Sequence, residues 1–142
     1  MKITIVAVGK LKEREVRVIA DDYWGRIRRV VRGIELEVKD DAQLRAAVPN
    51  ADVVVALEVD GKALTSEAFA RKLETWGQKG KGELVFLIGG AEGIPEDVSR
   101  KAHERLSLSS MTLPHRLARV LLLEQIYRGL SILRGEPYAR EG

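Results

Sequence analysis

Two short stretches in the second half of the chain carry residues that could hold a small cofactor. Residues 87–95 read Leu-Ile-Gly-Gly-Ala-Glu-Gly-Ile-Pro, and residues 106–115 read Leu-Ser-Leu-Ser-Ser-Met-Thr-Leu-Pro-His. Each follows or contains an apolar strand pattern, breaks into small residues and then enters a helix. Glycine lets a ligand approach the main chain, and free backbone N–H and C=O groups can read the edge of an adenine. The pair therefore predicts two adjacent cofactor-binding loops, although each loop alone fits a plain turn equally well.

The glycine run fits neither of the common phosphate-binding motifs. A dinucleotide fingerprint reads Gly-x-Gly-x-x-Gly after the first strand, with an acidic residue about 20 positions on. Here the run follows a later strand, and no strand-ending acid comes after it. No glycine is followed by Lys-Ser or Lys-Thr, so a P-loop is absent as well. The sequence thus argues against ATP and NAD.

Only two histidines occur, and one of them is well placed for chemistry. His115 is expected at the start of the last helix, where the helix dipole disfavours the protonated imidazole. A neutral His115 could donate to a substrate group or simply cap the turn. His103 is expected on the surface of a helix, and Trp76 in the core. Tyr23 and Trp24 could stack on a nucleobase or pack inside the protein.

The elements that must position these residues alternate between strands and helices. Strand patterns cover 2–8, 34–38, 53–57, 84–88 and 106–108, and helical patterns cover 13–29, 42–48, 67–76 and 115–134. A further helix is expected to begin at Pro95, Pro49 to end the second helix, and 60–62 to form a turn. The alternation predicts an α/β fold with a mostly parallel sheet and helices on both faces. Residues 1–142 are expected to form one domain.

The last helix is apolar nearly all the way round, unlike an ordinary surface helix. Its apolar positions are Leu117, Val120, Leu121, Leu122, Leu123, Ile126, Tyr127, Leu130, Ile132 and Leu133. One side can pack on the sheet and another on a second subunit, which predicts a homodimer. A helix buried inside one chain is the alternative.

Composition excludes several classes of site. The 142 residues include no cysteine, so disulfides, thiolate nucleophiles and cysteine-bound zinc are ruled out, and two histidines make a histidine-rich metal site improbable. No apolar run approaches the roughly 18 residues of a membrane span, and no signal-peptide pattern is visible. A cytoplasmic protein without metal or membrane contact is expected.

The charged residues are unevenly distributed, although the net charge is only +3. One basic cluster comprises Lys10, Lys12, Arg14, Arg17, Arg26, Arg28, Arg29 and Arg32, and a second comprises Arg116, Arg119, Arg128, Arg134 and Arg140. Such clusters fit a polyanionic partner such as RNA. A solvated helix face fits them equally well.

The motifs together resemble the RlmH family of SPOUT methyltransferases, which methylate N3 of a pseudouridine in large-subunit ribosomal RNA. The resemblance extends over the whole chain. Its strongest segments are 1–10, 56–62, 87–93, 106–115 and 119–128, and the tail 135–140 matches in part. It implies a C-terminal deep trefoil knot, an exceptional topology that no local pattern reveals.

The resemblance also implies S-adenosylmethionine as the methyl donor, a homodimer with the knot helices at its interface, and action on the assembled ribosome. The residues that it places at the cofactor are Leu57, Gly89, Gly90, Leu108, Ser109, Ser110, Met111, Thr112 and Leu113. The basic surface of the dimer would then dock on RNA phosphates.

The reaction that the resemblance implies is attack of an imide nitrogen on the methyl carbon of a sulfonium. Arg119, Arg128 or Arg140 could stabilise the anionic imide. His115 or Tyr138 could position the base, and Glu124 is expected to orient an arginine. Family tails usually read Pro-Tyr-His-Arg, whereas this chain has Ala139 in place of the histidine. We expect activity to survive this difference, because an imide needs little help to lose its proton.

Three other interpretations remain open at this point. The chain could be a SPOUT methyltransferase acting on another RNA, such as tRNA. It could be a non-catalytic RNA-binding or ribosome assembly factor that has kept the fold. An unrelated α/β nucleotide-binding protein is disfavoured, because the phosphate-binding loops are absent.

Overall fold

Five parallel strands form one sheet in the computed structural model, which describes residues 1–48 and 50–140. The strand order is β2-β1-β4-β3-β5. The strands are β1 (Lys2–Val8), β2 (Arg32–Val38), β3 (Val53–Ala63), β4 (Glu83–Ile88) and β5 (Glu104–Ser107). The helices are α1 (Arg14–Arg28), α2 (Asp41–Ala47), α3 (Ser66–Gly77), α4 (Glu96–Lys101) and α5 (His115–Arg134), followed by a 3-10 turn, η1 (Pro137–Arg140). The α/β fold with a parallel sheet is confirmed.

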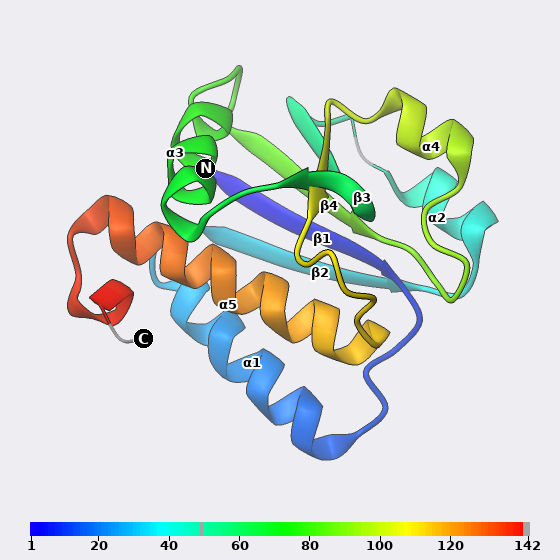
Figure 1. The fold of residues 1–142 in the computed structure, drawn as a ribbon, viewed down its shortest axis with the longest axis horizontal. Helices are drawn as coiled ribbons and strands as arrows, with labels where there is room; N and C mark the ends of the chain where they lie inside the picture. The colour runs from blue at the N-terminus through cyan, green and yellow to red at the C-terminus, as the bar shows by residue number, and fades with distance from the viewer. Residues whose placement is uncertain (49, 141–142) are drawn as a thin grey trace.

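Helices cover both faces of the sheet (Figure 1). On β4, Leu84, Phe86 and Ile88 face the layer of α1, α3 and α5. The alternate residues Val85 and Leu87 face the layer of α2 and α4. This continuous apolar strand is therefore buried from both sides, as its composition predicts.

Helix α5 lies between α1 and α3, and its bounds agree with the prediction (Figure 1). Leu122, Leu123 and Ile126 are buried in the core. Leu117 and Leu121 are 44% and 41% exposed, so the apolar surface of α5 is only partly covered by its own chain. Gly135 ends the helix with φ +68°, a left-handed conformation that glycine adopts without strain.

The turn predicted at 60–62 is wrong, because β3 continues to Ala63 through a wide bulge. Leu57 and Lys62 both pair with Leu106 of β5, so the intervening residues loop out of register. A Cβ on Gly61 would lie 2.9 Å from the backbone of Leu106. The glycine permits a close approach of two backbones here, a role that its sequence neighbourhood does not distinguish from a turn.

Two other predictions of local structure need correction. His103 is not on a helix: it follows α4, and its Nδ1 accepts a hydrogen bond from the backbone N–H of Val54 at 2.9 Å. Pro95 is the N-cap of α4, so the helix begins at Glu96, one position after the predicted start. The predicted helix end at Pro49 lies outside the described residues.

Candidate functional site

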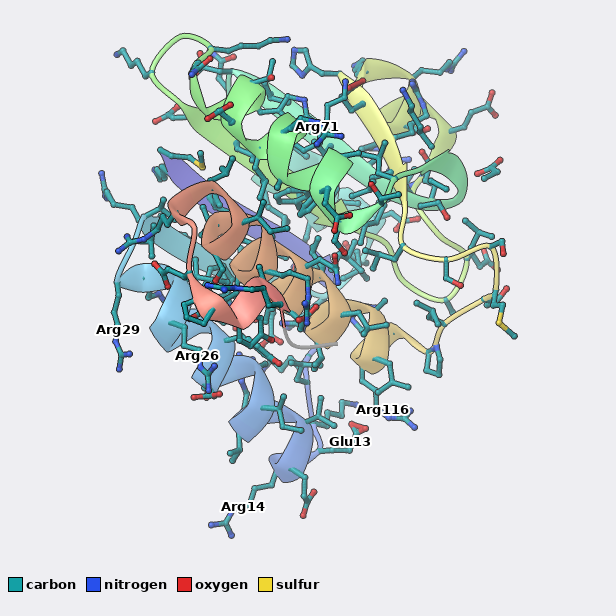
Figure 2. The ribbon with its side chains drawn as sticks, turned by 60° about the vertical axis from the view of Figure 1, so that its left-hand side comes forward. Glu13, Arg14, Arg26, Arg29, Arg71 and Arg116 are labelled. Atoms are coloured by element: carbon teal, nitrogen blue, oxygen red, sulfur yellow. The ribbon has the colours of Figure 1, made fainter. Side chains whose placement is uncertain are left out.

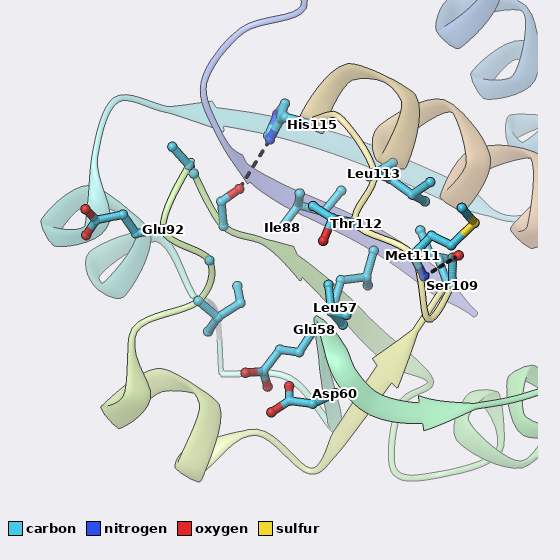
Figure 3. A pocket seen from close by; sticks show the side chains of 18 residues that line it. Leu57, Glu58, Asp60, Ile88, Glu92, Ser109, Met111, Thr112, Leu113 and His115 are labelled. Carbon is cyan, nitrogen blue, oxygen red and sulfur yellow. Dashed lines mark hydrogen bonds between the residues drawn. The ribbon is translucent and has the colours of Figure 1, made fainter.

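A pocket of about 420 Å³ opens at the carboxyl ends of the central strands β3 and β4 (Figure 3). Parallel α/β sheets bind their ligands at this edge. Its wall combines the β3 bulge, the loop after β4, the segment before α5 and the first turn of α5. The lining includes Leu57, Gly89, Gly90, Leu108, Ser109, Met111, Thr112, Leu113 and His115. The two loops singled out in the sequence thus meet at one cavity. Ser110 is exposed and does not line it.

The loop after β4 folds back tightly on itself. The backbone N–H of Gly93, which has φ +81°, donates to the carbonyl of Gly90 at 3.0 Å. A Cβ on Gly89 would lie 2.3 Å from the carbonyl carbon of Gly93, so no larger residue fits this position without moving the loop. The glycines therefore bring bare backbone up to the cavity.

The segment before α5 is held by its own serine hydroxyls. The Ser107 hydroxyl donates to the carbonyl of Ser109 at 2.8 Å, and the Ser109 hydroxyl accepts from the N–H of Met111 at 2.9 Å. The Met111 side chain lies beside the cavity and is 74% exposed (Figure 3). A flexible apolar side chain there can cover a bound aromatic ring.

His115 joins the two loops. Its Nδ1 lies 3.2 Å from the carbonyl oxygen of Gly89, and since a carbonyl only accepts, Nδ1 must carry the proton (Figure 3). Burial lowers the pKa of His115, and the charge of Arg119 lowers it further. The imidazole is thus held neutral, and its Nε2 is buried without a hydrogen-bond partner among the described residues.

Carboxylates are the charged groups in the wall of the pocket. Glu58, Asp60 and Glu92 line it, and no lysine or arginine does so among the described residues (Figure 3). Glu58 is anchored by the Ser99 hydroxyl, which donates to it at 2.7 Å. This charge favours a cationic ligand and disfavours a phosphate. Glu58 and Asp60 were not predicted at the site, because a turn at 60–62 would not place them on the pocket wall.

Arg119 lies outside the pocket lining, one turn along α5 from His115. Its side chain is 2% exposed, with Nη2 2.7 Å from Glu35 and Nη1 2.6 Å from Glu37. Arg17 also pairs with Glu35 at 2.8 Å. Arg119 is therefore enclosed by acids of β2 and supports the start of α5. Neither glutamate was singled out in the sequence, where both look like the polar half of an alternating strand.

Four other predicted residues lie where η1 folds back on α5. The Arg128 guanidinium pairs with Glu124 at 2.8 Å, and the Tyr138 hydroxyl donates to the same carboxylate at 2.8 Å. Glu124 thus holds the guanidinium of Arg128 in place. Burial raises the pKa of Tyr138, and its hydrogen bonds with Tyr23 and Glu124 raise it further, which keeps the phenol neutral. We call Glu124, Arg128, Tyr138 and Arg140 the tail cluster.

The structure does not bring the tail cluster to the pocket of the same chain. Arg128 lies 13 positions after His115 on a straight helix, a separation of about 20 Å at 1.5 Å per residue. Figure 1 shows η1 beside one end of α5 and the pocket loops at the other end. The predicted site residues therefore form two groups, one around the pocket and one at the tail.

Neither a metal site nor a membrane span is evident in the described residues. They include no group of three or more metal-ligating side chains of the kind that hold an ion. None of the helices in that part of the chain is long and apolar enough to cross a bilayer.

A parallel α/β fold with a pocket at the carboxyl ends of its central strands fits a methyltransferase of the SPOUT class, and the chain belongs to the SPOUT methyltransferase family. The sequence model of the family described as "Predicted SPOUT methyltransferase" matches residues 1–139.

Curated relatives with one name match almost the full chain. The ribosomal RNA large subunit methyltransferase H of Sorangium cellulosum is 51% identical over 144 residues, covering 98% of this chain and 99% of that protein. The protein of the same name from Alkaliphilus oremlandii is 39% identical, covering 97% and 99%.

Solved structures with low sequence identity share the fold. A probable methylase family protein from Haemophilus influenzae superposes with a TM-score of 0.65 at 12% identity, covering 94% of this chain and 68% of that one. TrmJ from Z. mobilis superposes with a TM-score of 0.56 at 14% identity, covering 91% and 70%.

Proposed function

We propose that this protein transfers a methyl group from S-adenosylmethionine to N3 of a pseudouridine in large-subunit ribosomal RNA. We place the reaction on the assembled ribosome, in the cytoplasm. The observation that carries the proposal is the pocket where the two small-residue loops meet, in a chain whose full-length relatives are named large-subunit ribosomal RNA methyltransferases.

The pocket residues suit S-adenosylmethionine in shape and charge. Its volume of about 420 Å³ lies within the usual range for small-molecule sites. Gly89 and Gly90 leave room for a ligand against the backbone, and Leu57, Leu108 and Leu113 supply apolar walls for an adenine. The carboxylates of Glu58 and Asp60 favour the cationic methionine part. The donor supplies an activated methyl group, so the protein has only to align it and to assist loss of the imide proton.

The protein's own groups would act mainly by alignment and electrostatics. Holding two reactants in line lowers such a barrier by up to about 7–11 kcal/mol. Arg128 and Arg140 are the arginines of the tail cluster, and in our proposal they stabilise the developing imide anion. Tyr138, kept neutral, donates a hydrogen bond and is not a base. Arg119 is a positioning residue, because its guanidinium is occupied by Glu35 and Glu37.

The proposal requires a homodimer in which the tail cluster of one subunit faces the pocket of the other. Two observations support it. The two groups of site residues are held apart by α5 within one chain. In addition, α1 and α5 pack side by side and expose apolar side chains, Val18 and Ile19 on α1 and Leu117 and Leu121 on α5. Exposed apolar patches of this kind mark protein interfaces. The proposal includes the deep trefoil knot of the family, formed around the segment before α5.

The decisive experiment is tritium transfer from labelled S-adenosylmethionine to ribosomes from cells that lack this protein, followed by mapping of the label. We expect one labelled pseudouridine in the large-subunit RNA, and no label in tRNA. Label in tRNA alone, or none in any RNA despite cofactor binding in calorimetry, would contradict the proposal.

A further inference from the structure

A second hollow, of about 620 Å³, lies at the opposite edge of the sheet from the cofactor pocket. It is formed where α1 ends and β2 begins, and is lined by Met1 and residues 28–34, three of which are Arg28, Arg29 and Arg32. We call it the arginine hollow. Figure 2 shows Arg29 projecting from this end of α1, while Arg14 projects from the other end of the same helix.

The arginines of the first basic cluster differ in what they already bind. Arg17 is paired with Asp21 and Glu35. Arg28 donates to the carbonyl of Gly33 and lies over the ring of Trp24. In contrast, Arg29 and Arg32 are exposed, and their side chains make no ion pair or hydrogen bond within residues 1–48 and 50–140.

The hollow concentrates positive charge without compensation from acids. No aspartate or glutamate occurs among its lining residues. The C-terminal end of the α1 dipole stabilises a cation near the last turn, which offsets part of the repulsion but leaves the guanidinium donors unused. Arg is the residue best suited to bidentate contact with phosphate oxygens, and two unoccupied arginines beside one hollow match successive phosphates of a nucleic acid backbone.

The hollow is also close to the tail cluster. The guanidinium carbon of Arg26, two positions before the last residue of α1, lies 6.0 Å from the ring centroid of Tyr138. RNA held at the hollow would therefore pass beside the residues that we assign to the substrate. The cofactor pocket, with its acidic wall, lies at the other edge of the sheet.

We propose that the arginine hollow binds backbone phosphates of the RNA substrate through Arg29 and Arg32, and so anchors the enzyme next to its target nucleotide. The identity of that RNA rests on the function proposed above, whereas the phosphate contact itself does not.

The test compares Arg29→Ala/Arg32→Ala with Arg14→Ala, which removes another exposed arginine, at the far end of α1. Binding to large ribosomal subunits and to protein-free large-subunit RNA is measured by sedimentation over a range of salt concentrations. Methyl transfer to ribosomes gives KM and kcat in parallel. We expect the double variant to weaken RNA binding by about tenfold and to lower the slope of log K against log salt by about 1.5, with KM raised, kcat kept, and normal affinity for S-adenosylmethionine. Arg29→Lys/Arg32→Lys should retain the salt slope.

Three outcomes would overturn the inference: unchanged binding and salt slope in the double variant, an equal loss in Arg14→Ala, or a loss on ribosomes but none on naked RNA. The last result would assign the hollow to an acidic ribosomal protein. If the wild-type protein methylates no RNA, the proposed function fails, and the sedimentation series still decides whether the hollow binds phosphates.

Discussion

The buried guanidinium of Arg119 lies 2.6 Å from the carboxylate of Glu37, and this ion pair ties the start of α5 to strand β2. Burial alone would raise the pKa of Glu37, but the N–H of Leu11 and the charge of Arg119 outweigh it and lower the pKa. The position of α5 at the edge of the pocket thus depends on a side chain that the sequence presented as a candidate for contact with substrate.

We expect Arg119→Met to destabilise the protein by about 3 kcal/mol, because Glu35 and Glu37 lose their shared cation in a largely buried place. Urea unfolding measures the change. Arg116→Met is the matched control, since Arg116 and Glu13 form an exposed pair whose loss costs less than about 1 kcal/mol. Equal losses of stability in the two variants would show that the buried ion pairs of Arg119 contribute no more to stability than the exposed pair of Arg116.

The histidine at the pocket should make stability depend on pH. The pKa of His115 is lowered in the folded protein from its ordinary value of 6.5, so the unfolded chain takes up the proton first. The contribution of neutral His115 is therefore complete above that value and is lost as pH falls toward the lower folded pKa. Urea midpoints from about pH 5 to 7.5 should fall at the acid end. His115→Gln should make the urea midpoint less dependent on pH. If the midpoint of this variant falls with pH as steeply as that of the wild type, His115 is not the source of the pH dependence.

Gly89→Ala should weaken binding of S-adenosylmethionine with little effect on the rest of the fold. The added methyl group would collide with the backbone of Gly93, so the loop has to open. Calorimetry should find the affinity for S-adenosylmethionine reduced by at least about tenfold, or 1.4 kcal/mol. Gly25→Ala, in an open position on α1, should instead stabilise the protein by about 0.5–1 kcal/mol and leave binding intact. Normal binding of S-adenosylmethionine by Gly89→Ala would show that this loop does not contribute to the binding site.

Mixing two inactive variants should restore activity if each site is shared between subunits. Gly89→Ala disables a pocket, and Arg128→Ala disables a tail cluster. Random reassociation of the two in equal amounts makes half of the molecules mixed dimers with one intact site each, giving about a quarter of wild-type activity. Methyl transfer is measured before and after joint refolding. No recovery, together with mixed dimers detected by mass spectrometry, would place the whole site within one chain.

Restoring the histidine of the family tail should change the rate little. We expect Ala139→His to alter kcat for ribosome methylation by no more than about tenfold, well below the ~10²–10⁴ that a general base supplies. The backbone carbonyl of Ala139 is 3.5 Å from Arg128, so the side chain can change without loss of that contact. A rise of several orders of magnitude would mean that the histidine is the missing base. Single-turnover kinetics at saturating cofactor gives the comparison.

Local patterns were sufficient to predict the order of elements and the meeting of the two small-residue loops, which line one pocket. Alternating apolar runs predict β1 and β4, and the apolar α5 is bounded by Pro114 and Gly135 as expected. These features depend on the spacing of apolar residues and on the residues that start and end each helix. Both are properties of residues that are close in sequence.

Features that depend on distant neighbours were not predictable in this way. The sequence around Gly61 fits a turn, and only its contact with β5 reveals a bulge. Likewise, His103 bonds to a strand almost fifty positions away, and Arg119 is neutralised by acids of β2. Side-chain partners across the fold decide whether an ionisable group faces ligand or core, and one sequence does not contain them.

Strand β2 forms one edge of the sheet, with open backbone groups that another strand could pair with. Glu35 and Glu37 project from it into the helical layer, where their charges are balanced only while Arg119 and Arg17 are in place. Charged residues that point inward on an edge strand discourage the addition of foreign strands. The carboxylates that hold α5 in position therefore also disfavour edge-to-edge pairing of β2 with other chains, which is a route to fibrils.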